Sequence, residues 1–143
     1  MKNTIYTLLC IYLCVIMMDG GFDKFHGNSL TTESTIIKLE KYNIKDHSEI
    51  LQKILYISGM KQTGYLWYLI GICEVLFGLL LCFTKTRFLA GLLLLPITLN
   101  ILLFHVFLEC DDIMKLFHVS LLFAINLFVL IVNKHKLKLF LVE

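Results

Sequence analysis

The sequence predicts an all-α membrane protein, a four-helix transmembrane bundle with a long first external loop that carries a short amphipathic helix. Hydrophobic residues make up 58% of the 143 residues and charged residues only 17%, whereas soluble domains are about 45–50% apolar and about 25% charged. The mean hydropathy of +0.80 points the same way. The apolar residues also gather in four long runs, and about 20 apolar residues suffice to cross roughly 30 Å of hydrocarbon. We expect a single membrane domain over residues 1–143.

The first helix is expected at about residues 4–22. Lys2 followed by the apolar stretch Thr4–Met18 also fits the start of a secretory signal peptide. No small-residue cleavage site follows that stretch, because the Met-Asp-Gly at residues 18–20 is a poor substitute for one. We therefore favour a retained helix.

The first loop, residues 23–63, is the only long polar segment. Six lysines and six acidic residues balance each other over residues 19–63. Near the end of the loop, Ser48–Ser58 has apolar residues at helical spacing, and Ser48 and Glu49 suit a helix start. We expect this amphipathic helix to lie at the membrane surface. We favour a helix that only covers the bundle over one with a further role.

The three remaining helices are expected at about residues 65–83, 88–108 and 116–132. The first two have the length of a span, whereas the last needs a slightly thinned bilayer or snorkelling ends. Three aromatic residues at the start of the 65–83 run fit the belt that marks a membrane interface: Tyr65, Trp67 and Tyr68.

Basic residues near the helix ends predict the orientation in the membrane. One side would hold six of them: Lys2, Lys85, Arg87, Lys134, Lys136 and Lys138. The 109–115 segment carries three acidic residues and one lysine, and therefore belongs outside. Both termini would then face the cytoplasm, and the 19–63 stretch would face out.

Three polar residues interrupt the apolar runs: Glu74, Asn100 and Asn126. An ionisable group in the bilayer interior costs about 2.5–3.5 kcal/mol, so Glu74 needs a reason to be there. With antiparallel neighbours, the three side chains fall into one layer, and we expect a buried polar cluster in which burial favours the neutral acid. Either the cluster only bonds helix to helix, or it is a site for a ligand, a quinone or a proton.

Glycines recur every seven residues around Glu74, at Gly64, Gly71 and Gly78. Such a stripe lets a neighbouring backbone approach closely. Glu74 shares nearly the same helical face, so we expect it to point towards protein rather than lipid.

A second polar group is expected at the outer end of the bundle. His105 and Glu109 form an i, i+4 pair near the end of their helix, and Lys24, beside Asp23, ends the first helix. We expect Asp23, Lys24 and Glu109 to form an outer rim near His105. Ordinary pairing and snorkelling at helix ends is the alternative.

The sequence shows no metal site and no evident cofactor motif. No two of the five cysteines have CxxC spacing, no Cys/His cluster has zinc-ligand spacing, and haem, iron–sulfur and nucleotide motifs are absent from the sequence. We expect the cysteines to act as small apolar packing residues: Cys10, Cys14, Cys73, Cys82 and Cys110. The net charge of +2 gives no indication of a nucleic-acid partner.

Three stretches resemble the DoxX-like family of small integral membrane proteins, which includes DoxD and MauE types. Residues 21–25 (GFDKF) resemble the family's G-x-x-K-F stretch. Residues 63–65 (TGY) and 74–81 (EVLFGLLL) are similar to its second helix, tGY…EvlaGllLl. Residues 95–105 (LPITLNILLFH) resemble its P-I-x-x-N-I-x-x-F-H stretch, and the likeness covers roughly residues 4–132.

The resemblance implies a four-helix membrane fold. DoxX-like proteins are linked to redox systems, including a thiosulfate:quinone oxidoreductase and oxidative-stress complexes. On that basis we expect an accessory subunit of a redox-linked (quinone or oxidative-stress) assembly, rather than an enzyme, in a bacterial-type cytoplasmic (inner) membrane. Its partners would be the lipid bilayer, redox proteins and further copies of itself. The alternative is a stand-alone protein that handles a quinone, another small molecule or a proton around Glu74, Asn100 and His105.

Overall fold

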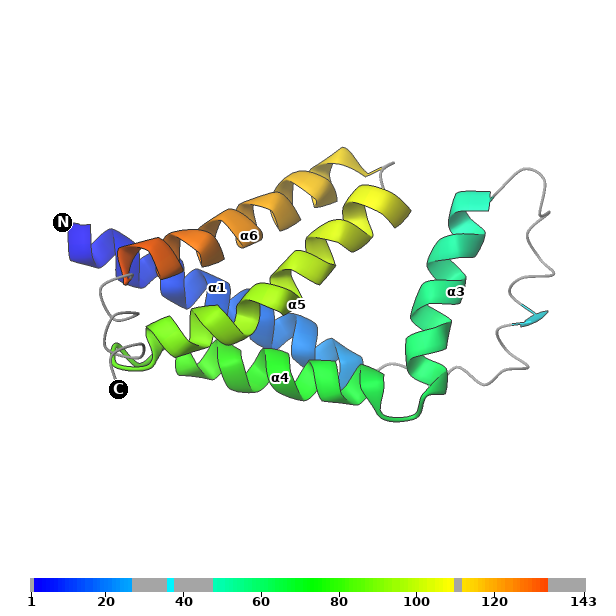
Figure 1. Cartoon of the computed structure of the whole chain (residues 1–143), viewed down its shortest axis with the longest axis horizontal. Coiled ribbons are helices and arrows are strands. Elements are labelled where there is room, and N and C mark those ends of the chain that lie inside the picture. Colours follow the sequence, from blue (N-terminus) through cyan, green and yellow to red (C-terminus); the bar gives the residue numbers. More distant parts are fainter. Residues whose placement is uncertain (1, 27–35, 38–47, 110–111, 134–143) are drawn as a thin grey trace, which may run out of the picture.

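The computed structural model describes residues 2–26, 36–37, 48–109 and 112–133, and within these it is all-α with no strand. Five helices are defined: α1 (Lys2–His26), α3 (Ser48–Gln62), α4 (Leu66–Leu80), α5 (Arg87–Leu108) and α6 (Ile113–Val132). Figure 1 shows α1, α4, α5 and α6 running side by side, with α3 standing across one end of the group. The basic residues expected beyond position 133, as well as Cys110 and Asp111, lie outside the described residues.

Helix α1 continues to His26, one turn beyond the expected end at residue 22. The reason is its packing against α4, which is the most extensive helix–helix contact. A Cβ atom at Gly21 would lie 2.8 Å from the Gly71 carbonyl oxygen, so only glycine lets the two backbones approach this closely. The last turn of α1 rests against the same helix, with Lys24 Cβ and Phe25 close to Gly71.

Helix α4 is shorter than expected, because it ends at Leu80 rather than at residue 83. Two side chains from the start of α5 bind the carbonyl groups at its end: Thr86 Oγ1 donates to Leu80 O at 2.7 Å, and Arg87 Nε donates to Leu81 O at 3.0 Å. These bonds satisfy carbonyls that lack an intrahelical partner and stabilise a turn. The 15 residues of α4 extend about 22 Å.

Gly64 does not belong to the glycine stripe of α4, contrary to the expectation from its spacing. It lies in the turn before that helix with φ of 76°, a conformation that suits glycine. The turn changes the chain direction by 87° between Leu51–Gln62 and Leu66–Leu80. The helix expected at residues 48–58 therefore reaches Gln62 and stands across the bundle.

Helices α5 and α6 form the second closely packed pair. The Asp112 side chain caps α6 by accepting a hydrogen bond from the Lys115 backbone at 3.1 Å, so α6 starts at Ile113, earlier than the expected residue 116. Gly91 lies against Asn126, whose oxygen would be 3.3 Å from a Cβ at that position.

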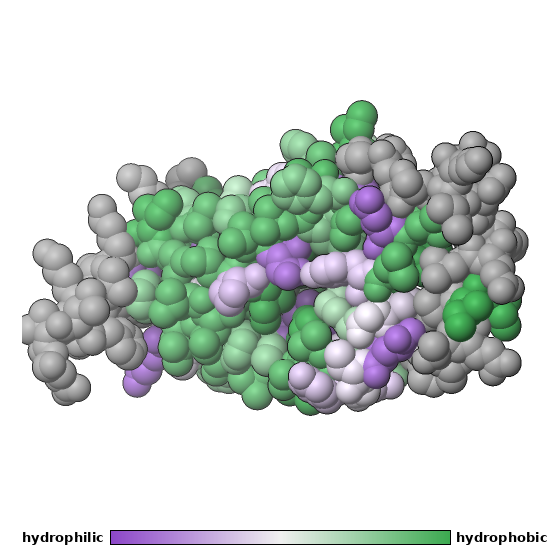
Figure 2. All heavy atoms as spheres, turned by 45° about the vertical axis from the view of Figure 1, so that its right-hand side comes forward, coloured by the Kyte–Doolittle hydropathy of each residue, from purple (hydrophilic) through white to green (hydrophobic). Residues whose placement is uncertain are grey.

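Among the described residues, three helices are long and apolar enough to cross a membrane: Thr4–His26, Arg87–Leu108 and Ile113–Val132. The bent pair of α3 and α4 would add a fourth crossing only if it counts as one span. Apolar side chains cover most of the flank that Figure 2 shows, and many of the exposed residues are large and hydrophobic, among them Leu8, Phe107 and Phe117. Lipid would cover such a surface, which a soluble monomer rarely exposes over so wide an area.

Candidate functional site

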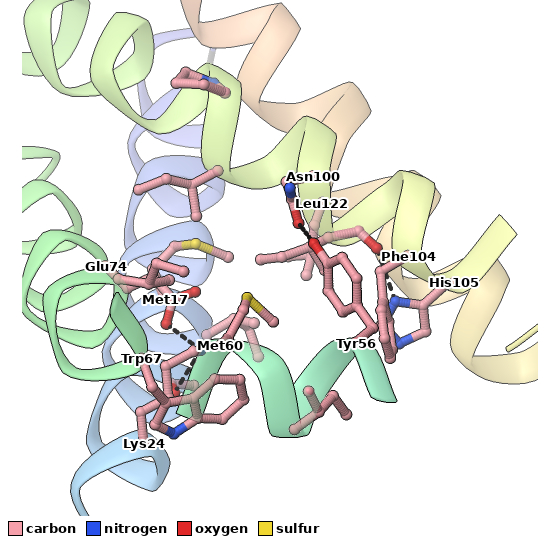
Figure 3. A pocket seen from close by; sticks show the side chains of 17 residues that line it. Met17, Lys24, Tyr56, Met60, Trp67, Glu74, Asn100, Phe104, His105 and Leu122 are labelled. Carbon is pink, nitrogen blue, oxygen red and sulfur yellow. Dashed lines mark hydrogen bonds and ion pairs between the residues drawn. The ribbon is translucent and has the colours of Figure 1, made fainter. Parts of the chain in front are cut away.

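A cavity of about 470 Å³ lies between α1, α3, α4 and α5, with one residue contributed by α6. This volume falls within the range of small-molecule sites. Most of the lining is apolar, and its polar side chains come from Lys24, Tyr56, Trp67, Glu74, Asn100 and His105. Figure 3 shows these polar residues in two groups at opposite ends of the cavity, with Met60 between them.

The first group is centred on an ion pair between α1 and α4. Lys24 Nζ donates to Glu74 Oε2 at 2.6 Å and to the Gly20 carbonyl oxygen at 3.1 Å. The Glu74 side chain is 2% exposed and that of Lys24 is 16% exposed. The ammonium group favours the carboxylate form of Glu74, whereas burial favours the neutral acid. The other carboxyl oxygen, Glu74 Oε1, is buried and has no hydrogen-bond partner.

Trp67 completes the first group. Its ring lies 5.4 Å from Lys24 Nζ and 4.9 Å from Lys61 Nζ, within the range of cation–π attraction. Its indole Nε1 is buried without a hydrogen-bond partner. The residue lines the cavity, which the assignment of Trp67 to an aromatic belt did not anticipate.

The second group joins α3 to α5. Tyr56 hydroxyl donates to Asn100 Oδ1 at 3.0 Å, and the Tyr56 ring lies 5.4 Å from that of Phe104. His105 Nδ1 donates to the Ile101 carbonyl oxygen at 2.8 Å. The two Tyr56 contacts help to hold α3 over the cavity, whereas the His105 bond lies within α5.

An ion cluster around Glu109 holds α3 from outside the cavity. Glu109 accepts from Lys53 of α3 and, at 3.2 Å, from Lys115 of α6, and its other oxygen lies 3.3 Å from His105 Nε2. Burial alone raises the pKa of the Glu109 carboxyl, but the two lysines together outweigh this effect and the pKa lies below its usual value. The Asp112 carboxyl also has a lowered pKa, because the Lys115 backbone and side chain bind it.

The structure brings together three of the four residues expected in the intramembrane site. Glu74, Asn100 and His105 line the cavity, but Asn126 does not. The prediction that Glu74, Asn100 and Asn126 form one cluster is wrong, because each has a different partner. Glu74 pairs with Lys24, Asn100 bonds to Tyr56, and Asn126 bonds to Thr98. Asn126 is fully buried, and its side-chain amide joins α6 to α5: Nδ2 donates to Gly91 O at 3.2 Å, and Oδ1 accepts from Thr98 Oγ1 at 3.0 Å.

The residues expected in the outer rim do not lie together either. Lys24 pairs with Glu74 across the α1–α4 contact, whereas Glu109 belongs to the ion cluster beyond α5. Asp23 is exposed and does not line the cavity. Gly71, Glu74 and Gly78 are all buried, which confirms the burial of Glu74 predicted from the glycine stripe.

Sequence reasoning missed Tyr56 and Trp67 as cavity residues. For Lys24 and Glu74 the sequence did contain an indication: each residue lies in one of the stretches that resemble the DoxX-like pattern. Within the described part of the chain, no group of three or more His, Cys, Asp or Glu residues has the arrangement of a metal site.

The family model named DoxX matches residues 5–106, which is more than half of the chain and includes all of α3 and α4 and nearly all of α1 and α5. No curated protein and no solved structure matches the chain significantly. All but one of the cavity-lining residues lie within the matched range. This match confirms the resemblance seen in the three sequence stretches, and the chain belongs to the DoxX family.

Proposed function

We propose that this DoxX-family membrane protein binds a small, largely apolar molecule with a hydrogen-bonding head, a quinone being the expected class, on behalf of a redox-linked membrane assembly. One observation carries the proposal. Two buried polar atoms of opposite hydrogen-bonding character, the acceptor Glu74 Oε1 and the donor Trp67 Nε1, have no partner, and both residues line the same cavity. Buried polar groups are almost always paired, so an unpaired donor and acceptor at one site favour a missing partner molecule.

The chemistry of the lining fits such a ligand. A quinone carbonyl needs a donor, which Trp67 Nε1 or Lys24 Nζ would supply. A quinol hydroxyl needs an acceptor, for which Glu74 Oε1 is available. The apolar remainder of the ligand would contact side chains such as Ile97, Ile101 and Phe104.

We favour an accessory role over catalysis because the sequence offers no motif for an electron carrier of its own. The ligand site would deliver or sense a molecule that a redox protein partner converts. The alternative is a stand-alone protein in which Glu74 handles protons or the ligand without a partner. Substitution of Glu74 by Gln in the absence of any partner protein separates the two, because only the stand-alone protein would lose an activity that it shows when purified alone.

The topology that goes with this proposal has four crossings and both termini in the cytoplasm of a bacterial-type inner membrane. Helix α4 is short for a span, but α1 lies along it, and the turn after it carries Lys85 and Arg87. A cysteine introduced at position 86 should resist a membrane-impermeant maleimide added to intact cells. Labelling of that position from outside would reverse the orientation.

Fluorescence provides the direct test of binding, because Trp67 is the only tryptophan in the chain. Decylubiquinone added to the purified full-length protein in detergent should quench Trp67 emission to a saturating level. Glu74→Gln and Tyr56→Phe should weaken this binding roughly tenfold, about 1.4 kcal/mol. Tyr68→Phe is the matched control, because Tyr68 stacks on Phe25 and does not line the cavity. Quenching that rises without saturation, or equally in all variants, would rule out a quinone site here.

A further inference from the structure

Two cysteines that are far apart in the sequence lie in contact where the middle of α1 meets the end of α4. Cys14 Sγ of α1 is 3.3 Å from Cys82 Sγ in the turn that follows α4. The two residues are 68 positions apart, so the pair has no CxxC spacing in the sequence. We propose that Cys14 and Cys82 form a reversible disulfide when the protein meets a hydroperoxide, which makes the pair an oxidant-responsive modification site.

The surroundings hold the two thiols together. Gly78 lies against Cys14 and Met17, and a Cβ there would be only 3.4 Å from the Cys14 carbonyl oxygen. This close approach of α4 to α1 brings the following turn, with Cys82, to Cys14. A disulfide bond of about 2 Å then needs only a small further approach of the two sulfur atoms.

The two thiols differ in exposure, which suits a reaction in which one thiol meets the oxidant first and the other then completes the disulfide. Cys82 is exposed, whereas Cys14 is buried. Oxidant-sensing thiols are accessible and stand next to a second thiol that completes the disulfide. Cys82 is therefore the thiol that meets the oxidant, and Cys14 is the resolving thiol. Met18 Sδ, 3.7 Å from Cys14 Sγ, supports the orientation of the buried thiol.

The hydroperoxide is the only oxidant that the reaction needs. The Cys82 thiolate attacks the peroxide, the O–O bond breaks, and water or an alcohol leaves, which gives a sulfenic acid at Cys82. The Cys14 sulfur then attacks the Cys82 sulfur, the S–O bond breaks and water leaves as the disulfide forms. Two thiols lose two electrons, and the hydroperoxide gains them.

The disulfide would fasten α1 to the end of α4. Both helices also form one wall of the cavity, through Met17 and Lys24 on α1 and through Trp67 and Glu74 on α4. The inference does not depend on what the cavity binds, because the thiol pair lies outside its lining.

The test uses the full-length chain with only these two cysteines left, as the C10A/C73A/C110A variant. After hydrogen peroxide treatment, free thiols are blocked with N-ethylmaleimide, disulfides are reduced, and the released thiols are labelled with a polyethylene glycol maleimide. We expect a monomer that gains two labels, and peptide mass spectrometry should find the Cys14–Cys82 link in the peroxide-treated wild-type protein as well. The further substitution Cys14→Ala should abolish the link and leave a sulfenic acid at Cys82 that dimedone traps.

The matched control keeps Cys10 and Cys82 instead, as C14A/C73A/C110A. Cys10 lies one turn from Cys14 on the same helix, so this variant should form far less intramolecular disulfide. Equal cross-linking through Cys10 would overturn the assignment of the pair. The proposal also fails if Cys82 reacts with maleimide while peroxide gives no Cys14–Cys82 link in either the variant or the wild-type protein.

Discussion

The two ends of the bundle differ in how completely they are packed. The packed end is built on a continuous buried core that includes Cys10, Leu13, Leu81, Ala90, Leu94 and Val129. The cavity end, where α3 stands across the other helices, contains the 470 Å³ space and its two groups of polar residues. The same four long helices thus form a solid core at one end and a chamber at the other.

Their polar groups differ in the same way. At the packed end, Asn133 Nδ2 donates to Tyr6 hydroxyl at 2.6 Å, and Arg87 donates to Leu81 O and Thr7 Oγ1. The buried side-chain polar atoms that lack a partner, among the described residues, belong to Ser58, Trp67 and Glu74. All three stand on α3 or α4 and none at the packed end. Polar side chains bond helices together at both ends, but the unpaired buried polar atoms of the described residues lie only on the two helices of the bent pair, α3 and α4.

The largest expected effect tests the ion pair of the cavity end. Glu74→Leu leaves Lys24 without its partner in a largely buried position, which should destabilise the protein by about 3 kcal/mol. Replacing both residues, as K24M/E74L, should recover more than half of that loss, since no uncompensated charge then remains. Thermal unfolding in detergent measures both variants. Equal losses in the single and double variants would mean that the pair does not determine stability.

The second prediction separates stability from binding. Leu94→Ala removes a fully buried side chain from the packed end and should cost about 2 kcal/mol, mainly through lost packing. Decylubiquinone binding, followed by Trp67 fluorescence, should keep its affinity, because Leu94 does not line the cavity. If the affinity falls as far as in Glu74→Gln, the two ends are not independent.

A smaller effect is expected from pH at the ion cluster that holds α3. The pKa of Glu109 is lower in the folded protein than its usual value of about 4.3, so its ion pairs contribute fully above that value. The contribution is lost as the pH falls through the lowered folded pKa. Wild type should therefore exceed Glu109→Gln in stability by about 1 kcal/mol at pH 7.

This difference should shrink as the pH is lowered from 7 towards 2, through the lowered folded pKa of Glu109. The other titratable groups around Glu109, namely Lys53, His105, Lys115 and Asp112, are present in both proteins, so the comparison isolates Glu109. Thermal unfolding of both proteins over this pH range gives the result. A difference that persists undiminished at the acid end of this range would contradict the assignment.

The smallest effect is expected at Asn126. Its bond to Thr98 is one interhelical hydrogen bond, and such bonds in membrane bundles average about 0.6 kcal/mol. Asn126→Ala should lower stability by about this amount and leave quinone binding unchanged. A large loss of binding would move Asn126 back into the site that the sequence assigned to it.

The helices themselves could be predicted from the sequence because apolar runs have a length that the bilayer dictates. The ends of those runs were less accurate, since Thr86 and Arg87 end α4 through bonds to carbonyl groups that hydropathy does not report. Gly64 was misplaced for a related reason: heptad spacing cannot tell a helical glycine from one with φ of 76°.

For the site, the sequence identified the residues better than their partners. The position of Glu74, Asn100 and His105 within apolar runs of the sequence marked them as unusual, and all three line the cavity. Their contacts depend on how α1 crosses α4 and where α3 docks, and a single sequence contains neither. Cys14 and Cys82 show the same limit, because nothing in their spacing indicates that their sulfur atoms meet.

Two of the residues that line the cavity, Pro96 and Asn100, are also exposed on the flank of α5. With α5 across a bilayer, as in the proposed topology, this flank would face lipid, and the chamber would open sideways rather than towards the water. An apolar ligand would then arrive by diffusion within the plane of the lipid, where it is already concentrated far above its level in water. The occupancy of the site would follow the mole fraction of ligand in the bilayer. A modest intrinsic affinity would be enough, and the same opening would allow rapid exchange with a neighbouring protein.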